Sequence, residues 1–152
     1  MPAARPSYFP ALAAERPDIA LCRASAAVAK AGEAHAAATE LGVGQHLVLK
    51  MLDAVGDCAQ QTLAAELRID RSVMVTVCDD LERSGDIRRE RNPKDRRSYA
   101  VTITAAGRER LRTAEAAIPG FLAGAFAALT PEERVQLTTL LGKLLATGGA
   151  SE

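Results

Sequence analysis

The sequence has 152 residues, which is enough for one domain with a hydrophobic core or for a small domain with an oligomerisation element. Its 19 basic and 19 acidic side chains cancel, so the total charge indicates no polyanionic partner. The three cysteines lack a C-x-x-C spacing, which argues against a disulfide framework and a zinc knuckle. We expect no signal peptide, no membrane span and no cofactor, and therefore a cytoplasmic protein.

The N-terminal part of the chain predicts an arm followed by a long helix. Four prolines fall within residues 1–17, which we interpret as an arm that is ordered only if something packs on it. Asp18 can cap a helix, and the alanine-rich sequence after it predicts a helix to about Ala38 within residues 18–41. The apolar face of this helix consists of small residues, which favours close approach to another helix.

Residues 42–104 are predicted to combine three short helices with a β-hairpin. Apolar residues at helical spacing, bounded by glycines and turn residues, predict helices at about 45–55, 59–67 and 71–84. Asp57, followed three residues later by Gln60, resembles a capping box at the start of the second helix. Either Asp70 or Ser72 caps the third helix, whose predicted buried face is Met74, Val77, Cys78 and Leu81.

After Gly85 the apolar pattern changes from helical spacing to strict alternation. This alternation, with β-branched residues in its second half, predicts a hairpin over about 87–103 with its tip at 92–96. Arg88, Arg89 and Arg91 alternate on its first strand, so they cannot all face one partner. We expect one or two of them to bond acids or carbonyls inside the protein.

Two further helices are predicted within residues 105–147. Thr104 caps the first, and Pro119-Gly120 is expected to interrupt it. The sequence Thr130-Pro131-Glu132-Glu133 combines an N-cap threonine, a proline at N1 and a glutamate at N3, which is a strong helix start. The last helix carries more leucine than a lone surface helix needs. Residues 148–152 are interpreted as a C-terminal tail.

Positive charge is concentrated around the predicted hairpin of this otherwise neutral chain. Residues 83–97 hold seven basic and three acidic side chains. A helix–turn–helix followed by a basic hairpin is the order of a winged helix-turn-helix, in which the second helix enters the major groove and the hairpin reaches the minor groove or the backbone. Arginine suits a narrow minor groove because the negative potential is focused there.

Four short motifs occur in order between Gln60 and Gly107: Leu63-Ala64, Leu81-Glu82-Arg83-Ser84-Gly85, Asp95-Arg96-Arg97 and Ile103-Thr104-Ala105-Ala106-Gly107. In these motifs the chain resembles the MarR family of bacterial transcription regulators. The resemblance implies a mainly α fold, with a winged helix-turn-helix DNA-binding region at 42–104 and a helical dimerisation region at 18–41 and 105–147. It also implies a homodimer that binds a palindromic operator in double-stranded DNA as a repressor or an activator, and we expect a repressor.

The resemblance places DNA contacts on the second and third short helices and on the wing. Arg97 matches the wing arginine that enters the minor groove, and Asp95 matches the carboxylate expected to brace its guanidinium. Val75 and Thr76 offer fewer polar atoms than the family pattern, so phosphate and minor-groove contacts are expected to carry more of the binding. The DNA-contacting residues expected from the resemblance are Gln61, Thr62, Arg71, Ser72, Val75, Thr76, Lys94, Asp95, Arg96 and Arg97.

Regulators of this kind are usually released from DNA by a small organic effector or by thiol oxidation, as the resemblance implies. Cys22 lies roughly where peroxide-sensing members keep a reactive cysteine, although the tyrosines of those members are missing here. Cys58 and Cys78 are interpreted as packing residues. His35 and His46 lack further ligands, so no metal site is assigned. The effector and the residues that bind it are left unassigned.

Two other classes of function compete with DNA-binding regulation. A winged helix can also serve as a protein–protein interaction module, but such a module does not need the Asp95-x-Arg97 sequence at its tip. An enzyme is not expected, because the sequence shows no paired carboxylates in an apolar setting, no glycine-rich phosphate loop and no histidine near a plausible nucleophile.

Overall fold

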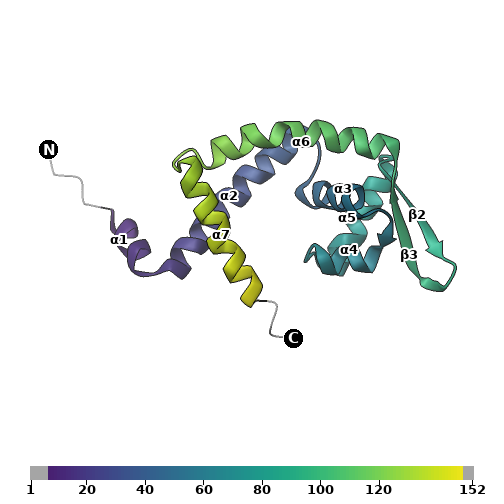
Figure 1. Ribbon diagram of the computed structural model, residues 1–152, viewed down its shortest axis with the longest axis horizontal. Coiled ribbons are helices and arrows are strands. Elements are labelled where there is room, and N and C mark those ends of the chain that lie inside the picture. Colours follow the sequence, from purple (N-terminus) through teal and green to yellow (C-terminus); the bar gives the residue numbers. More distant parts are fainter. Residues whose placement is uncertain (1–6, 149–152) are drawn as a thin grey trace. The chain divides into compact units, whose positions relative to one another are not determined.

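The computed structural model describes residues 7–148, with the exception of the Arg96 side chain (Figure 1). The chain divides into two compact units, Met1–Ala114 and Glu115–Glu152, and the division falls inside a long helix. Within the described residues, no helix combines the length and apolarity needed to cross a membrane. The elements in chain order are α1 (Tyr8–Glu15), α2 (Pro17–Thr39), α3 (Val43–Val55), β1 (Cys58–Ala59), α4 (Gln60–Glu66), α5 (Arg71–Arg83), β2 (Ile87–Asn92), β3 (Asp95–Ile103), α6 (Ala105–Ala125) and α7 (Pro131–Thr147).

The predicted arm contains a short helix, α1, which packs against the following helix α2. Residues 1–6 of the arm lie outside the described part of the chain. Pro17 occupies the first turn of α2, where its missing N–H removes no helical hydrogen bond. The sequence predicted Asp18 as the N-cap, and this prediction is wrong. Asp18 lies in the first turn of α2 and forms an ion pair with Arg16 at 2.7 Å. The long helix itself runs close to its predicted range.

The three short helices and the hairpin form the winged domain, residues 43–103. The capping box expected from Asp57 is absent: Ala59 is the N-cap of α4 and makes no side-chain hydrogen bond. Cys58 and Ala59 are instead extended, and they pair with Val101 and Ala100 as the short strand β1. The sheet therefore has three antiparallel strands in the order β1-β3-β2, one strand more than the predicted hairpin.

The core of the winged domain lies between the helices and one face of the sheet. The predicted buried face of α5 is confirmed, because Met74, Val77, Cys78 and Leu81 are all buried. Alternation along the strands places Ile87, Val101 and Ile103 in the same core. The other members of the core are Leu41, Val48, Leu49, Leu52, Leu63, Ala64, Leu111 and Ala114.

The first turn of α6 packs against the backbone at the base of the wing. Thr104 caps α6 as predicted, because its hydroxyl accepts a hydrogen bond from the Gly107 N–H at 3.0 Å. The same hydroxyl donates to the Gly85 carbonyl at 2.6 Å, and the Thr104 N–H donates to the Asp86 carbonyl at 3.0 Å. The cap thus joins the end of β3, the start of α6 and the turn before β2.

The second unit consists of the last part of α6 and of α7. The prediction that the helix is interrupted at Pro119-Gly120 is wrong, because α6 continues through these residues to Ala125. A proline removes one backbone donor, and an alanine-rich helix of this length tolerates that loss. The predicted start of α7 is confirmed: the Thr130 N–H donates to Glu133 Oε2 at 2.8 Å and the Glu133 N–H donates to Thr130 Oγ1 at 3.2 Å.

Candidate nucleic-acid interface

The start of α5 is fixed by Asp70, whose carboxylate accepts hydrogen bonds from the Ser72 N–H at 2.8 Å and from the Ser72 hydroxyl at 2.5 Å. The hydrogen bond from the Ser72 hydroxyl, assisted by the backbone bond, lowers the pKa of Asp70 below its ordinary value. The Asp70 carboxylate therefore stays charged, and the Ser72 hydroxyl already donates its proton to this carboxylate. The exposed residues of the capped helix include Arg71, Ser72, Val75 and Thr76.

The first turn of α4 presents Gln61 and Thr62 to solvent. Their neighbour Gln60 is half-buried and turns inward, because its side-chain oxygen accepts a hydrogen bond from Arg89 Nη1 at 3.3 Å. Backbone N–H groups at the start of a helix have no helical acceptor, so polar side chains there suit an anionic partner. The geometry leaves Gln61 and Thr62 available for such a contact.

Asp95 organises the end of the wing through the backbone. Its carboxylate accepts the Arg97 N–H at 3.0 Å, and its carbonyl accepts the Ser98 hydroxyl at 3.2 Å. The expected brace between Asp95 and the Arg97 guanidinium is absent, and the carboxylate binds the backbone of the same residue instead. At the turn, the Lys94 N–H donates to Asn92 Oδ1 at 3.0 Å. Asp95 therefore shapes the wing rather than pairing with its cation.

The pairing register of the wing shifts next to the turn. Arg91 pairs with Tyr99 and the next residue, Asn92, pairs with Asp95, so residues 96–98 have no partner on β2. Such a bulge redirects side chains out of the alternating pattern of the ladder. Arg97 is exposed and Ser98 is buried within it. The side chain of Arg96, also expected to contact DNA, lies outside the described part of the structure.

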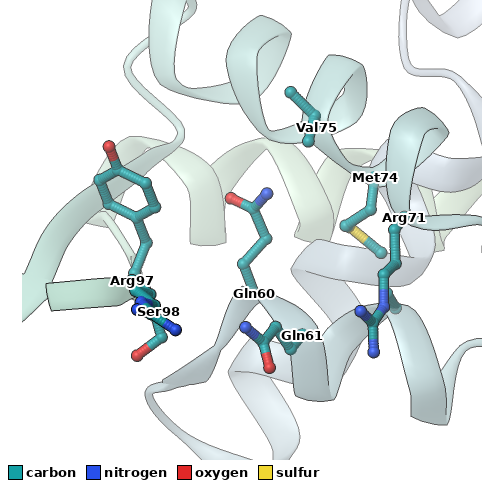
Figure 2. Close-up of a pocket in the computed structure, with 9 residues that line it drawn as sticks. Gln60, Gln61, Arg71, Met74, Val75, Arg97 and Ser98 are labelled. Carbon is teal, nitrogen blue, oxygen red and sulfur yellow. The ribbon is translucent and has the colours of Figure 1, made fainter. Parts of the chain in front are cut away.

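A groove of about 240 Å³ joins α4, α5 and the wing (Figure 2). Figure 2 shows Gln60 and Gln61 between Arg97 on one side and Arg71 on the other. Neither Arg71 nor Arg97 forms an ion pair with a carboxylate of residues 7–148, so both guanidinium groups keep their hydrogen-bonding capacity. The residues that line the groove are Gln60, Gln61, Ala64, Arg71, Met74, Val75, Arg97, Ser98 and Tyr99.

One of the wing arginines is bonded inside the protein, as predicted. Arg89 forms ion pairs with Asp79 at 2.6 Å and with Glu82 at 2.7 Å, and both acids belong to α5. Partial burial by itself lowers the pKa of Arg89, but the hydrogen bonds and charges of Glu82 and Asp79 outweigh burial and raise that pKa above its ordinary value. Arg89 is therefore a permanently charged internal group and not a free DNA contact.

The cysteines differ in exposure. Cys22 is exposed on α2, Cys58 is half-buried and Cys78 is buried. Burial raises the pKa of the Cys58 thiol, and it raises the pKa of Cys78 to about 11. Among the described residues, no group of three or more His, Cys, Asp or Glu side chains is placed to hold a metal ion. Cys22 is therefore the most accessible thiol for an oxidant.

Comparison with known proteins identifies the domain that carries this groove. Residues 41–99 match the family model described as "MarR family". Over these residues the chain is similar to the MarR family. The match includes α5 and most of the wing, and it ends at the groove residue Tyr99.

Two curated relatives are named as HTH-type transcriptional regulators. The chain is 35% identical over 96 residues to the uncharacterized HTH-type transcriptional regulator YkoM of Bacillus subtilis (strain 168), a match over 63% of this chain and 62% of that protein. It is 33% identical over 87 residues to the HTH-type transcriptional regulator BilQ of Clostridium symbiosum (strain WAL-14163), over 57% of this chain and 60% of that protein. The matched part spans about three fifths of each relative. Their names agree with the expectation that the protein is not an enzyme.

A solved structure shares the fold over a larger part of the chain. Bordetella bronchiseptica BpsR is a protein whose DNA binding is regulated by 6-hydroxynicotinic acid. Its structure matches this chain with a TM-score of 0.73 and 26% sequence identity. The alignment covers 82% of this chain and 89% of the BpsR chain. The fold class inferred from the sequence, a winged helix-turn-helix with additional helices, is confirmed.

Sequence reasoning missed several residues of the interface region. Gln60, Ser98 and Tyr99 line the groove but were not among the expected contacts. The partners of Arg89 were not specified, although Asp79 and Glu82 lie three residues apart on α5 and therefore on one helix face. That spacing, opposite an alternating strand of arginines, is the signal that could have identified them.

Proposed function

We propose that the protein is a homodimeric transcriptional repressor that binds a palindromic operator through α5 and the wing. The observation that carries the proposal is the groove in which Arg71 and Arg97 both lie without a carboxylate partner from the described residues. Guanidinium groups bind phosphate through paired N–H donors, and they also enter narrow minor grooves. The direct contacts in this proposal are Gln61, Thr62, Arg71, Ser72, Val75, Thr76, Lys94, Arg96 and Arg97, and Asp95 shapes the wing.

The homodimer is supported by the apolar surface of α7. All residues of this helix that the structure describes are at least partly exposed, and the side chains of Val135, Leu140, Leu144 and Leu145 are 57–67% exposed. Apolar side chains gathered on one short helix favour burial against another chain. In this proposal residues 18–41 and 105–147 form the dimer layer. A two-fold dimer places two winged domains on a two-fold symmetric DNA site.

Release from DNA is proposed to follow binding of a small organic effector or oxidation of Cys22. Support for an effector comes from BpsR, whose DNA binding is regulated by 6-hydroxynicotinic acid. Cys22 lines a cavity of about 450 Å³ together with residues of α1 and α2. A thermal-shift screen with phenolic acids, peroxides and metal ions tests this part, because a ligand of the folded state raises its melting temperature by mass action.

DNA binding itself is tested by an electrophoretic mobility shift with the promoter region that adjoins the protein's own gene. The proposal predicts a specific shift whose affinity falls steeply with salt, because cations of the protein displace counterions from phosphates. Absence of a shift, or an affinity independent of salt, would contradict the proposal and favour a protein–protein interaction module.

A further inference from the structure

The side chain of Arg89 connects three elements of the winged domain. Arg89 belongs to β2, and its side chain is only 15% exposed. Nη2 donates to Asp79 Oδ1 at 2.6 Å and to Glu82 Oε2 at 2.7 Å on the recognition helix α5. Nη1 donates to Gln60 Oε1 at 3.3 Å at the start of α4. One guanidinium group therefore binds the wing to both helices of the helix–turn–helix.

Three more contacts fix the orientation of Arg89. Glu82 binds the residue twice more, because Arg89 Nε donates to Oε2 at 3.1 Å and the backbone N–H of Arg89 donates to Oε1 at 3.2 Å. The Arg89 guanidinium carbon lies 5.6 Å from the centre of the Tyr99 ring on β3, within the range of a cation–π contact. Both strands of the wing are thus tied to the same charged centre.

The same strand offers a natural comparison. Arg88 precedes Arg89 and pairs with Thr102 through the backbone, its side chain is exposed, and that side chain forms no ion pair within residues 7–148. Replacement of either arginine removes the same charge from the same strand. Differences between the two variants therefore report on the contacts of Arg89 and not on net charge.

We propose that Arg89 is a positioning residue that holds the wing at a fixed place relative to α5, so that Arg97 of the wing and Arg71 of α5 face the same groove. Arg89 touches no DNA in this proposal. A hairpin of two strands is marginally stable alone, and β1 adds only Cys58 and Ala59 to the other side of β3. Beside the apolar core that the base of the wing shares with α5, the ion pairs of Arg89 supply a polar connection to this helix. Pre-positioning of the wing lowers the ordering cost of binding. The part of the inference that concerns DNA rests on the proposed function, whereas the anchoring of the wing does not.

The anchoring is tested without DNA by amide hydrogen exchange of the full-length protein. In Arg89→Met the amides of β2 and β3 are expected to exchange at least tenfold faster than in the wild type, while the amides of α3 keep their protection. Arg88→Met is expected to exchange like the wild type. Glu82→Gln, which keeps an acceptor oxygen but loses the charge, is expected to show a smaller increase confined to the same strands. Arg89→Lys is expected to restore part of the protection.

The effect on DNA binding is tested with the same variants across a series of salt concentrations. Arg89→Met is expected to bind promoter DNA at least tenfold more weakly than Arg88→Met, with a dependence of log K on log salt equal to that of Arg88→Met. A positioning residue changes affinity without changing the number of phosphate contacts, whereas loss of one phosphate contact lowers the slope by about 0.9.

Unchanged exchange of the wing in Arg89→Met, or equal acceleration in the wing and in α3, would overturn the anchoring. A salt slope lower than that of Arg88→Met would show that Arg89 contacts phosphate directly, and would also overturn the proposal. If neither the wild type nor any variant binds DNA, the proposed function fails. The exchange experiment then still decides whether Arg89 anchors the wing.

Discussion

The carbonyl oxygen of Asp86 occupies the space beside Gly107 where any other residue would carry its β-carbon. A β-carbon built on Gly107 would lie 2.1 Å from that oxygen and 3.0 Å from the Asp86 carbonyl carbon. The close approach lets α6 start directly beneath the base of the wing, where Thr104 caps it. The glycine of the Thr104-x-x-Gly107 motif is therefore required by contact between two backbones.

Gly107→Ala is expected to lower the free energy of unfolding by about 3 kcal/mol, because the obstructing atom belongs to the backbone and cannot rotate away. Gly120→Ala is the matched change in the same helix, where a new β-carbon meets no atom within 4 Å. That variant is expected to be more stable by about 0.5–1 kcal/mol. Urea unfolding measures both, and equal effects of the two changes would contradict the packing described.

Removal of the Arg110 guanidinium is expected to destabilise the protein by about 3 kcal/mol, since it leaves the carboxylate of Asp86 buried without a charge partner. The two residues are paired at 2.5 Å, and the Asp86 side chain is 5% exposed. Arg108→Met breaks a pair with Asp53 in which both side chains are about half exposed, and is expected to cost less than about 1 kcal/mol. If Arg110→Met unfolds in urea no more easily than Arg108→Met, the buried pair does not have this role.

Alkaline pH is expected to destabilise the wild type more than Cys78→Ala. Burial raises the pKa of Cys78 from 9.0 to about 11 in the folded state. Between these values the unfolded chain releases the thiol proton while the folded chain retains it, so stability falls as pH rises through this window and is unaffected by Cys78 below it. Urea unfolding of both proteins at pH 7, 9 and 10 measures how steeply the free energy of unfolding falls with pH.

Cys22→Ala provides the control for this titration, because Cys22 is exposed on α2. It is expected to keep the slope of the wild type, whereas Cys78→Ala flattens it. Identical slopes for all three proteins would argue against a buried, protonated thiol at position 78.

The double variant Leu140→Glu/Leu144→Glu is expected to convert a dimer to a monomer. Both side chains are 57% exposed on α7, and two carboxylates at an apolar interface lose their hydration without gaining a partner. Size-exclusion chromatography with light scattering measures the mass. Gln136→Glu adds charge at another exposed position of the same helix and is expected to remain dimeric. A dimeric double variant would place the interface elsewhere.

Local patterns predicted most of the winged domain because the forces involved are local. The apolar spacing of α5 depends on one helix face meeting one core, and all four predicted residues are buried. The cap at Thr130 needs only residues within one turn, and both of its hydrogen bonds are present. The wing followed from strict alternation and from the β-branched residues of its second half.

Expectations that depended on distant partners were less successful. Asp57 and Gln60 have the spacing of a capping box, but Cys58 and Ala59 pair with β3, and Gln60 binds Arg89. Asp95 has the spacing to brace Arg97, yet its carboxylate binds the nearer backbone N–H. In both cases a backbone or long-range partner competes with the side-chain pair suggested by the sequence, and no local pattern encodes the outcome.

The most direct test of DNA binding through the wing is the salt dependence of promoter binding by Arg97→Met. The variant is expected to melt like the wild type, to bind at least tenfold more weakly, and to have a salt slope lower by about 0.9. Arg112→Met, which removes an exposed arginine of α6, is expected to keep the affinity and the slope of the wild type. Wild-type affinity and slope for Arg97→Met would contradict the account.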